Sequence, residues 1–165
     1  MDLTTSNRRV EAREQVRVAA GLVVEEAGRI APDAQGVLRI VVDGPPPGKP
    51  RMTQRDTWKK RPCVMRYRDW CDRVRKAVGI KLPPAKSVQA LDWVAYFEPP
   101  KSRPKKLREL CIGHLHCAKP DRDNIDKAVL DCLYREDSSI AMGTIQKRWG
   151  STARIEITIH YKTDG

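Results

Sequence analysis

The chain has 165 residues, of which 32 are Lys or Arg and 21 are Asp or Glu, so its formal net charge at pH 7 is +11. This length suits one compact domain, and a hydrophobic fraction of 40% is enough for a core, which excludes disorder throughout. No apolar run approaches the roughly 18–20 residues that cross a bilayer, and acidic residues interrupt the N-terminal segment where a secretory signal would be apolar, so we expect a soluble, cytoplasmic protein with no membrane contact.

The positive charge points to a polyanionic partner. Lys and Arg side chains that neutralise phosphates gain affinity by releasing condensed counterions, so nucleic acid is the leading candidate. A purely solvating role for the basic surface stays open at this point. The five cysteines are scattered and odd in number, which is typical of reduced, small hydrophobic residues rather than of a disulfide framework.

Residues 1–35 are predicted to form an N-terminal amphipathic helical extension. Apolar residues from Val16 to Ile30 recur at steps of three and four, with Arg and Glu between them, and Pro32 and Gly36 end the pattern. We expect this helix to dock on the following domain, residues 36–165, or to pair with a second copy.

The first half of residues 36–165 alternates strands and helices. A β-rich run, Val37–Asp43, ends at Gly44-Pro45-Pro46-Pro47-Gly48, because proline lacks the N–H that a central strand needs. A strongly basic loop over 49–61 follows, for which a phosphate-contacting arm and an ordinary solvated loop are equally plausible. Spacing predicts a helix over 63–78 and alternation predicts a strand over 91–97.

The second half completes an α+β domain. We expect a short basic helix near 101–108, a strand over 111–118, and two final strands over 139–148 and 154–161 that pair as an antiparallel hairpin. The economical packing of these elements is a mixed β-sheet with helices packed on one face.

The segment from Lys119 to Leu133 carries the clearest chemical signal. Its apolar residues, from Ile125 to Leu133, have the spacing of a helix with one buried stripe, and Asp123 just before them is a natural N-cap. Lys127 and Asp131 follow Asp123 at intervals of four, so all three lie along one edge of the stripe.

These acids have two interpretations. Asp121 and Asp123 could simply cap the helix, with Lys127 paired to Asp131. Alternatively, clustered carboxylates in a basic protein would be held together by a divalent cation. Mg²⁺ prefers such hard oxygen ligands together with phosphate oxygens, and a lysine beside it would stabilise developing negative charge. A second acidic pair, Glu136-Asp137, favours the metal interpretation.

The pattern K-P-D-x-D-N-x-x-K-A-V-x-D-x-L over 119–133, followed by that acidic pair, resembles the RusA family of Holliday-junction resolvases of phages and prophages. The likeness runs from about Val37 to Tyr161. The Gly-Pro segment followed by Lys49-Pro50-Arg51 is similar to the family's opening, and Gly113-His114 is similar to its phage members.

The resemblance implies a small, dimeric, Mg²⁺-dependent endonuclease, with Mn²⁺ as a substitute, that cuts four-way DNA junctions symmetrically in a bacterial cell or phage-infected host. Residues 36–165 would be the RusA-like endonuclease domain. Matched by motif, Asp121, Asp123 and Asp137 take the metal-binding positions and Lys127 that of the essential lysine, which together form the catalytic set. Glu136 competes with Asp137 as third ligand. Asp131 would orient Lys127 or pair with a nearby base.

Branched DNA is therefore the expected partner, bound by a homodimer, since paired cuts across a nearly two-fold junction call for two symmetry-related sites. Basic residues in the loops and on the last hairpin are expected to bind it. The DNA-binding candidates are Lys49, Arg51, Lys59, Lys60, Lys105, Lys119 and Lys147.

Two other interpretations stay open. Cys111, His114, His116 and Cys117 supply four zinc-type ligands, but their spacing along a strand is poor for a tetrahedral site, and we expect the histidines to contact DNA or to lie near the acids instead. The chain could also be a non-catalytic basic DNA-binding module of a phage or prophage.

Overall fold

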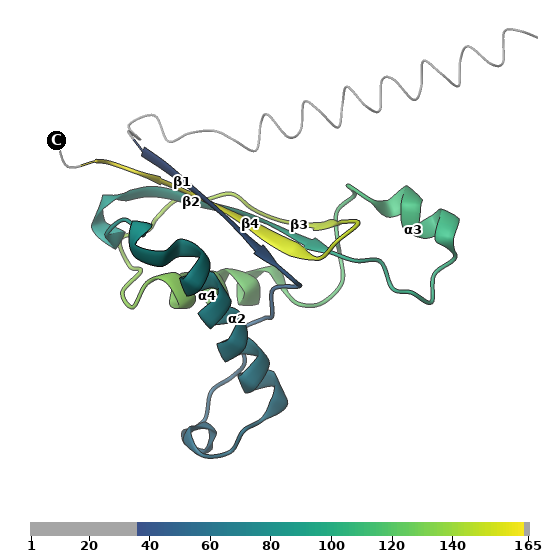
Figure 1. The fold of residues 1–165 in the computed structure, drawn as a ribbon, viewed down its shortest axis with the longest axis horizontal. Coiled ribbons are helices and arrows are strands. Elements are labelled where there is room, and N and C mark those ends of the chain that lie inside the picture. Colours follow the sequence, from purple (N-terminus) through teal and green to yellow (C-terminus); the bar gives the residue numbers. More distant parts are fainter. Residues whose placement is uncertain (1–35, 164–165) are drawn as a thin grey trace, which may run out of the picture. The chain divides into compact units, whose positions relative to one another are not determined.

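The computed structural model describes residues 36–163, and the predicted N-terminal helix lies outside them. The predicted α+β class is confirmed by a four-stranded mixed sheet and three α-helices (Figure 1). The strands are β1 (Gly36–Asp43), β2 (Val88–Phe97), β3 (Ile145–Trp149) and β4 (Arg154–Tyr161). The α-helices are α2 (Pro62–Val78), α3 (Lys105–Cys111) and α4 (Arg122–Leu133), and the 3-10 helices are η1 (Gln54–Thr57), η2 (Gly79–Lys81) and η3 (Ala85–Ser87).

The strand order is β1-β4-β2-β3, which contradicts the predicted closing hairpin. β4 pairs antiparallel with both β1 and β2, whereas β3 pairs parallel with the far edge of β2. The connection between β3 and β4 therefore crosses the end of β2, where Gly150 donates a hydrogen bond to the Phe97 carbonyl at 2.9 Å. A Cβ on Gly150 would lie 2.9 Å from that of Tyr96, so a larger residue would collide with the strand being crossed.

Helices α2 and α4 cover one face of the sheet (Figure 1). The predicted stripe of α4 is fully confirmed, because each of its five apolar residues is buried. Trp70 of α2 and Trp93 of β2 are buried between these layers with Ile157 of β4. The Trp93 indole N–H also donates to Asp126 of α4 at 2.8 Å, which fixes the rotation of that helix on the sheet. No helix within residues 36–163 has the length and apolar character to span a membrane.

The predicted strand over 111–118 is wrong. Cys111 ends α3, Gly113 has a left-handed φ of +87°, and the rest of the segment makes one isolated bridge, Leu115 to Arg148. We expected the two histidines to contact DNA or to lie near the acids; His116 is buried and cannot contact DNA, whereas His114 is exposed. The His116 ring stacks on Phe97 with centroids 4.4 Å apart and meets the Trp149 ring edge-on at 4.2 Å.

The predicted strand over 139–148 begins only at Ile145, although its earlier part still runs beside β2. Thr144 donates its backbone N–H to Asp92 of β2 at 2.6 Å, and the other Asp92 oxygen lies 2.9 Å from the buried ring of His160. A Cβ on Gly143 would lie 2.0 Å from the Leu91 carbonyl, so only glycine allows this close approach.

We expect the burial of His116 to make folding pH-dependent. Burial, and then the positive charge of Lys147, lower the pKa of His116, so the unfolded chain binds this proton at higher pH than the folded chain does. The free energy of unfolding should therefore decrease as pH falls from about 7 to about 5. Urea unfolding across this range should show a smaller decrease for His116→Phe than for the wild type. Equal pH slopes for the two proteins would contradict this assignment.

Candidate active site

Two acidic residues lie in the open at the start of α4. The helix begins at Arg122, so its N-cap is Asp121, and the predicted cap Asp123 lies in the first turn instead. Asp121 has extended backbone angles and its carboxylate makes no capping hydrogen bond. Both side chains are exposed. The interpretation of Asp121 as a simple helix cap is therefore not supported.

Lys127 lies one turn further along the same exposed face. Its ammonium is 3.6 Å from the Asp123 carboxylate, and the two side chains are 63% and 68% exposed. Ion pairs this exposed contribute little to stability, so the Lys127 side chain can move toward another anion at small cost. The alternative pairing of Lys127 with Asp131 does not form.

Asp131 pairs with Lys49 instead, as one of our expectations allowed. Lys49 reaches α4 because the Gly-Pro segment after β1 passes over the start of that helix. The Lys49 backbone N–H donates to the Asn124 carbonyl at 3.0 Å. A Cβ on Gly48 would already lie 3.4 Å from the side chains of Asn124 and Pro120. This segment therefore places a cation beside the acidic face.

Lys147 of β3 holds the backbone of the segment that leads into Asp121. Its ammonium donates to the backbone carbonyl of Ala118 at 2.6 Å and to that of Pro120 at 2.7 Å. Lys147 is half-buried in this position. These contacts tie the sheet edge to the residues just before the acids, and the DNA-binding role that we predicted for Lys147 stays a prediction.

Asp137 lies four residues beyond the end of α4 and is half-buried. The neighbouring carboxylate of Glu136 accepts the Ser138 backbone N–H at 3.2 Å, and its hydrogen bonds to Ser138 lower the pKa of Glu136. Among residues 36–163, no three His, Cys, Asp or Glu side chains gather closely enough to hold a metal ion. Asp121, Asp123 and Asp137 therefore do not form a closed set of three metal ligands in this structure, and neither do the four zinc-type ligands.

The basic loop over 49–61 is anchored by one buried carboxylate. Arg61 forks onto Asp56 with contacts of 2.6 and 2.7 Å and also donates to the Arg51 carbonyl at 2.7 Å. Thr53 donates to Asp56 from its backbone and hydroxyl. The Arg61 guanidinium, helped by Thr53, holds the pKa of Asp56 well below its usual range. Within this ordered loop, the exposed side chains include the predicted DNA-binding residues Arg51, Lys59 and Lys60.

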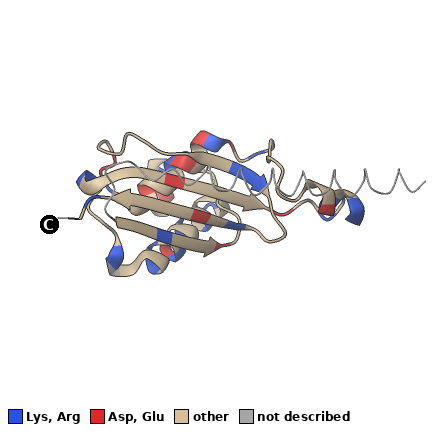
Figure 2. Ribbon diagram, turned by 90° about the horizontal axis from the view of Figure 1, so that it is seen from above, with Lys and Arg blue, Asp and Glu red and all other residues tan. Residues whose placement is uncertain are grey.

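The remaining predicted DNA-binding residues are exposed. Lys119 lies two residues before Asp121, and Lys105 at the start of α3 makes only a 3.9 Å pair with Glu109. Figure 2 shows Lys and Arg spread over helices, strands and loops, α3 included, rather than confined to one element.

Sequence reasoning missed three acids that join elements of the fold to one another. Asp126 accepts from Trp93, Asp92 accepts from Thr144, and Asp56 accepts from Arg61. Only Asp56 left a local signal, because Thr53 and Asp56 have the spacing of a capping box. The other two contacts join residues 33 and 52 positions apart.

A comparison with protein families settles the family question. The model of endodeoxyribonuclease RusA matches residues 43–160, which include β1's end, α4 and all the acids described above. The chain belongs to the RusA family. No match is found among curated proteins. RusA proteins are metal-dependent crossover-junction endodeoxyribonucleases, so membership implies a nuclease that acts on branched DNA.

We expect Lys147→Met to destabilise the fold. The change removes two hydrogen bonds from a charged donor, an exposed one to the Ala118 carbonyl and a part-buried one to the Pro120 carbonyl, so the free energy of unfolding should fall by about 1–3 kcal/mol, measured by urea unfolding. Lys105→Met is the matched control, since its only ion pair is exposed and worth less than about 1 kcal/mol. If the two variants unfold at the same urea concentration, Lys147 does not position the segment before Asp121.

Proposed function

We propose that this RusA protein is a Mg²⁺-dependent endonuclease that resolves four-way DNA junctions by paired, symmetric phosphodiester hydrolysis. The observation that carries the proposal is the arrangement at the start of α4, where two exposed carboxylates and Lys127 share one face inside the segment that the family model matches.

The donor chemistry at this position fits a hard cation. Mg²⁺ usually takes one or two protein carboxylates, keeps several waters and completes its shell with substrate phosphates. Asp121 and Asp123 would supply those carboxylates, and Mn²⁺ would fit the same oxygen ligands. When bound, the ion supplies an activated water and stabilisation of the leaving oxygen.

Asp137 is our candidate for a third carboxylate. The Glu136 carboxylate already accepts a hydrogen bond from Ser138, whereas the Asp137 carboxylate makes no hydrogen bond or ion pair within residues 36–163. Carboxylates repel one another, and a divalent cation removes that repulsion. We therefore propose that cation binding draws Asp137 toward the start of α4. Loss of activity in Asp137→Asn but not in Glu136→Gln would support this choice.

The lysines around the acids have separate proposed roles. Lys127 would leave Asp123 and stabilise the negative charge that develops as the phosphodiester is cut. Lys119 would hold the neighbouring phosphate. Lys49 and Lys147 act first as positioning residues, through Asp131 and through the carbonyls before Asp121. The exposed residues Arg51, Lys59, Lys60 and Lys105 would contact the junction arms, where each phosphate contact contributes affinity that falls with salt.

We expect Asp121→Asn and Asp123→Asn to abolish cutting and preserve binding. Either change removes an oxygen ligand, so Mg²⁺-dependent nicking of a synthetic four-way junction should fall by more than about 100-fold. Junction affinity, measured by gel shift in EDTA, should stay the same or rise, because a repulsive charge near phosphate is lost.

The control for these variants is Asp72→Asn, an equal change of charge at an exposed residue of α2. It should cut at the wild-type rate. The same experiment separates the nuclease from the alternative of a basic DNA-binding module. A wild-type protein that binds junctions but produces no Mg²⁺-dependent nicks would establish the binding module and overturn our proposal.

A homodimer is also part of the proposal. The stretch 107–115, which follows the basic start of α3, exposes several large apolar side chains. Such a concentration is typical of an interaction surface, and α3 projects beyond the helices that cover the sheet (Figure 1). We propose that a second copy covers it. The residues are Leu107 (54% exposed), Leu110 (61%), Ile112 (41%) and Leu115 (62%).

We expect Leu110→Asp to disrupt this dimer. Light scattering should give the wild type a mass near twice 18.8 kDa, whereas the variant should shift toward the monomer, because a buried unpaired charge opposes association. Met142→Asp, at a residue 51% exposed elsewhere, is the control and should stay dimeric. A wild-type protein that is monomeric, or a Leu110→Asp variant of unchanged mass, would contradict the proposed surface.

A further inference from the structure

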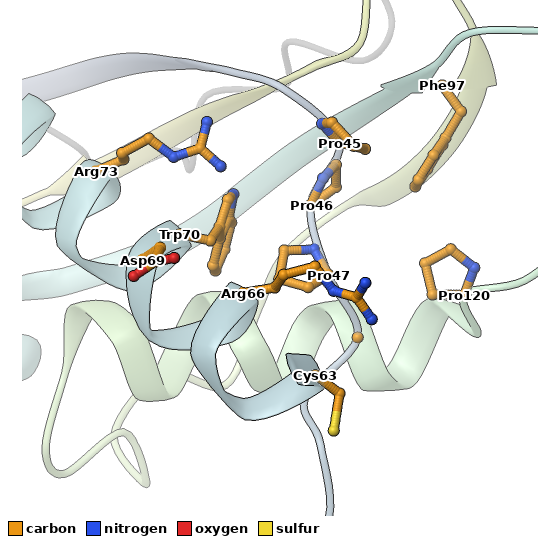
Figure 3. Close-up of a pocket in the computed structure, with 11 residues that line it drawn as sticks. Pro45, Pro46, Pro47, Cys63, Arg66, Asp69, Trp70, Arg73, Phe97 and Pro120 are labelled. Carbon is orange, nitrogen blue, oxygen red and sulfur yellow. The ribbon is translucent and has the colours of Figure 1, made fainter. Parts of the chain in front are cut away.

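A cavity lies beside the candidate active site and is not used by the chemistry described above. It has a volume of about 740 Å³, within the range of small-ligand pockets. Pro120 lines the cavity, and Asp121 is the next residue along the chain. Figure 3 shows its α2 side chains on one side and Phe97 and Pro120 on the other, with the Gly-Pro segment between them. The apolar lining residues are Pro45, Pro46, Pro47, Trp70, Phe97 and Pro120.

Two of the three charged groups on the α2 side of this cavity, Arg66 and Asp69, have no partner among residues 36–163. Arg66, Asp69 and Arg73 lie at i, i+3 and i+7 on one helix face, yet they form no ion pair with one another. Arg73 donates to the Asp43 carbonyl at 2.6 Å. Arg66 and Asp69 make no ion pair or side-chain hydrogen bond with any residue in 36–163. The cavity therefore offers both hydrogen-bond donors and an acceptor next to apolar walls.

Trp70 gives a second, independent observation that points to a ligand. Its side chain is fully buried, and its indole N–H has no hydrogen-bond partner within residues 36–163. Buried donors are normally paired, by protein or by a bound molecule. Trp70 also lines the cavity, so the residue with this unpartnered donor forms part of the cavity wall.

We propose that this cavity takes one unstacked nucleobase of the branched DNA, next to the scissile phosphate. A base has flat faces for the proline and aromatic walls, and an edge of donors and acceptors for Arg66, Asp69 and Trp70. Its phosphate would lie toward Asp121, because Pro120 connects cavity and acids. A nucleotide at a branch point costs less to unstack than one inside a duplex. The inference rests on the proposed nuclease function and makes this cavity its base-selecting element.

The test uses a synthetic four-way junction with 2-aminopurine placed, one position at a time, at the nucleotides on either side of the branch point. Binding is measured in EDTA, so no cutting occurs. We expect fluorescence to rise severalfold at one position, because unstacking relieves quenching of this base. Arg66→Ala, which empties the edge of the cavity, and Cys63→Trp, which fills it from its rim, should remove the rise. Lys76→Ala removes an equal charge from an exposed α2 residue outside the cavity and should keep it.

A second measurement uses an abasic nucleotide at the responding position. Cleavage of that junction by the wild type should fall by about tenfold, the size of one lost base contact. Arg66→Ala should cut the abasic and intact junctions at equal rates. Folding of both cavity variants is checked by thermal unfolding, and Arg66→Ala suffices if Cys63→Trp unfolds.

Failure of this inference differs from failure of the nuclease proposal. If the wild type cuts junctions but 2-aminopurine stays quenched at every position, the cavity does not take a base and the nuclease assignment survives. A rise that persists in Arg66→Ala and Cys63→Trp places the unstacked base elsewhere and has the same consequence. If cavity variants change the oligomeric mass instead, the cavity is a protein contact. A protein that binds junctions without cutting them removes the nuclease proposal alone, because the fluorescence test does not need cleavage.

Discussion

The packing of α4 on the sheet determines which of its charged side chains are exposed at the candidate site. Five apolar residues of this helix are buried, and Asp126 on the flank of that stripe accepts the Trp93 indole N–H, so the helix has one permitted rotation. With a period of 3.6 residues per turn, this rotation leaves Asp123, Lys127 and Asp131 on the exposed side. The functional face is therefore a consequence of core packing. A change in the core that rotated α4 by a fraction of a turn would move all three charges together.

The start of α4 is held from two further directions, and this explains how a short acidic segment stays ordered on a basic protein. Lys147 approaches from the sheet edge and fixes the carbonyls before Asp121, while the segment ending at Lys49 approaches from β1 and pairs with Asp131. Both contacts are made by cations near the acids. Each lowers the electrostatic cost of the clustered carboxylates, and neither uses the Asp121 or Asp123 oxygens that a metal would need.

Features that depend on residues close together in the chain were predicted correctly from the sequence. Features that depend on contacts between distant segments were not. The burial stripe of α4 and the helix predicted over 63–78, which the structure places at Pro62–Val78, follow from local periodicity, and both were confirmed. The pairing of β3 was wrong, because adjacency along the chain favours a hairpin, whereas β2 offers β3 a free parallel edge in register from Trp93 and Ile145. The roles of Lys147 and His116 were missed for the same reason. Lys147 is 29 positions from Ala118, and no local pattern encodes that contact.

The arrangement of charge also constrains how DNA would approach. A uniformly basic surface binds any duplex, because phosphates attract cations regardless of shape. An exposed acidic pair reverses that attraction locally, so a phosphate comes close to Asp121 and Asp123 only where a cation offsets the repulsion and other contacts hold the DNA in place. A cavity adjoining Asp121 supplies such a contact when a nucleotide leaves the stack. Branched DNA, whose strands are unstacked most easily at the crossover, then meets both conditions at once, whereas continuous duplex meets only the electrostatic one.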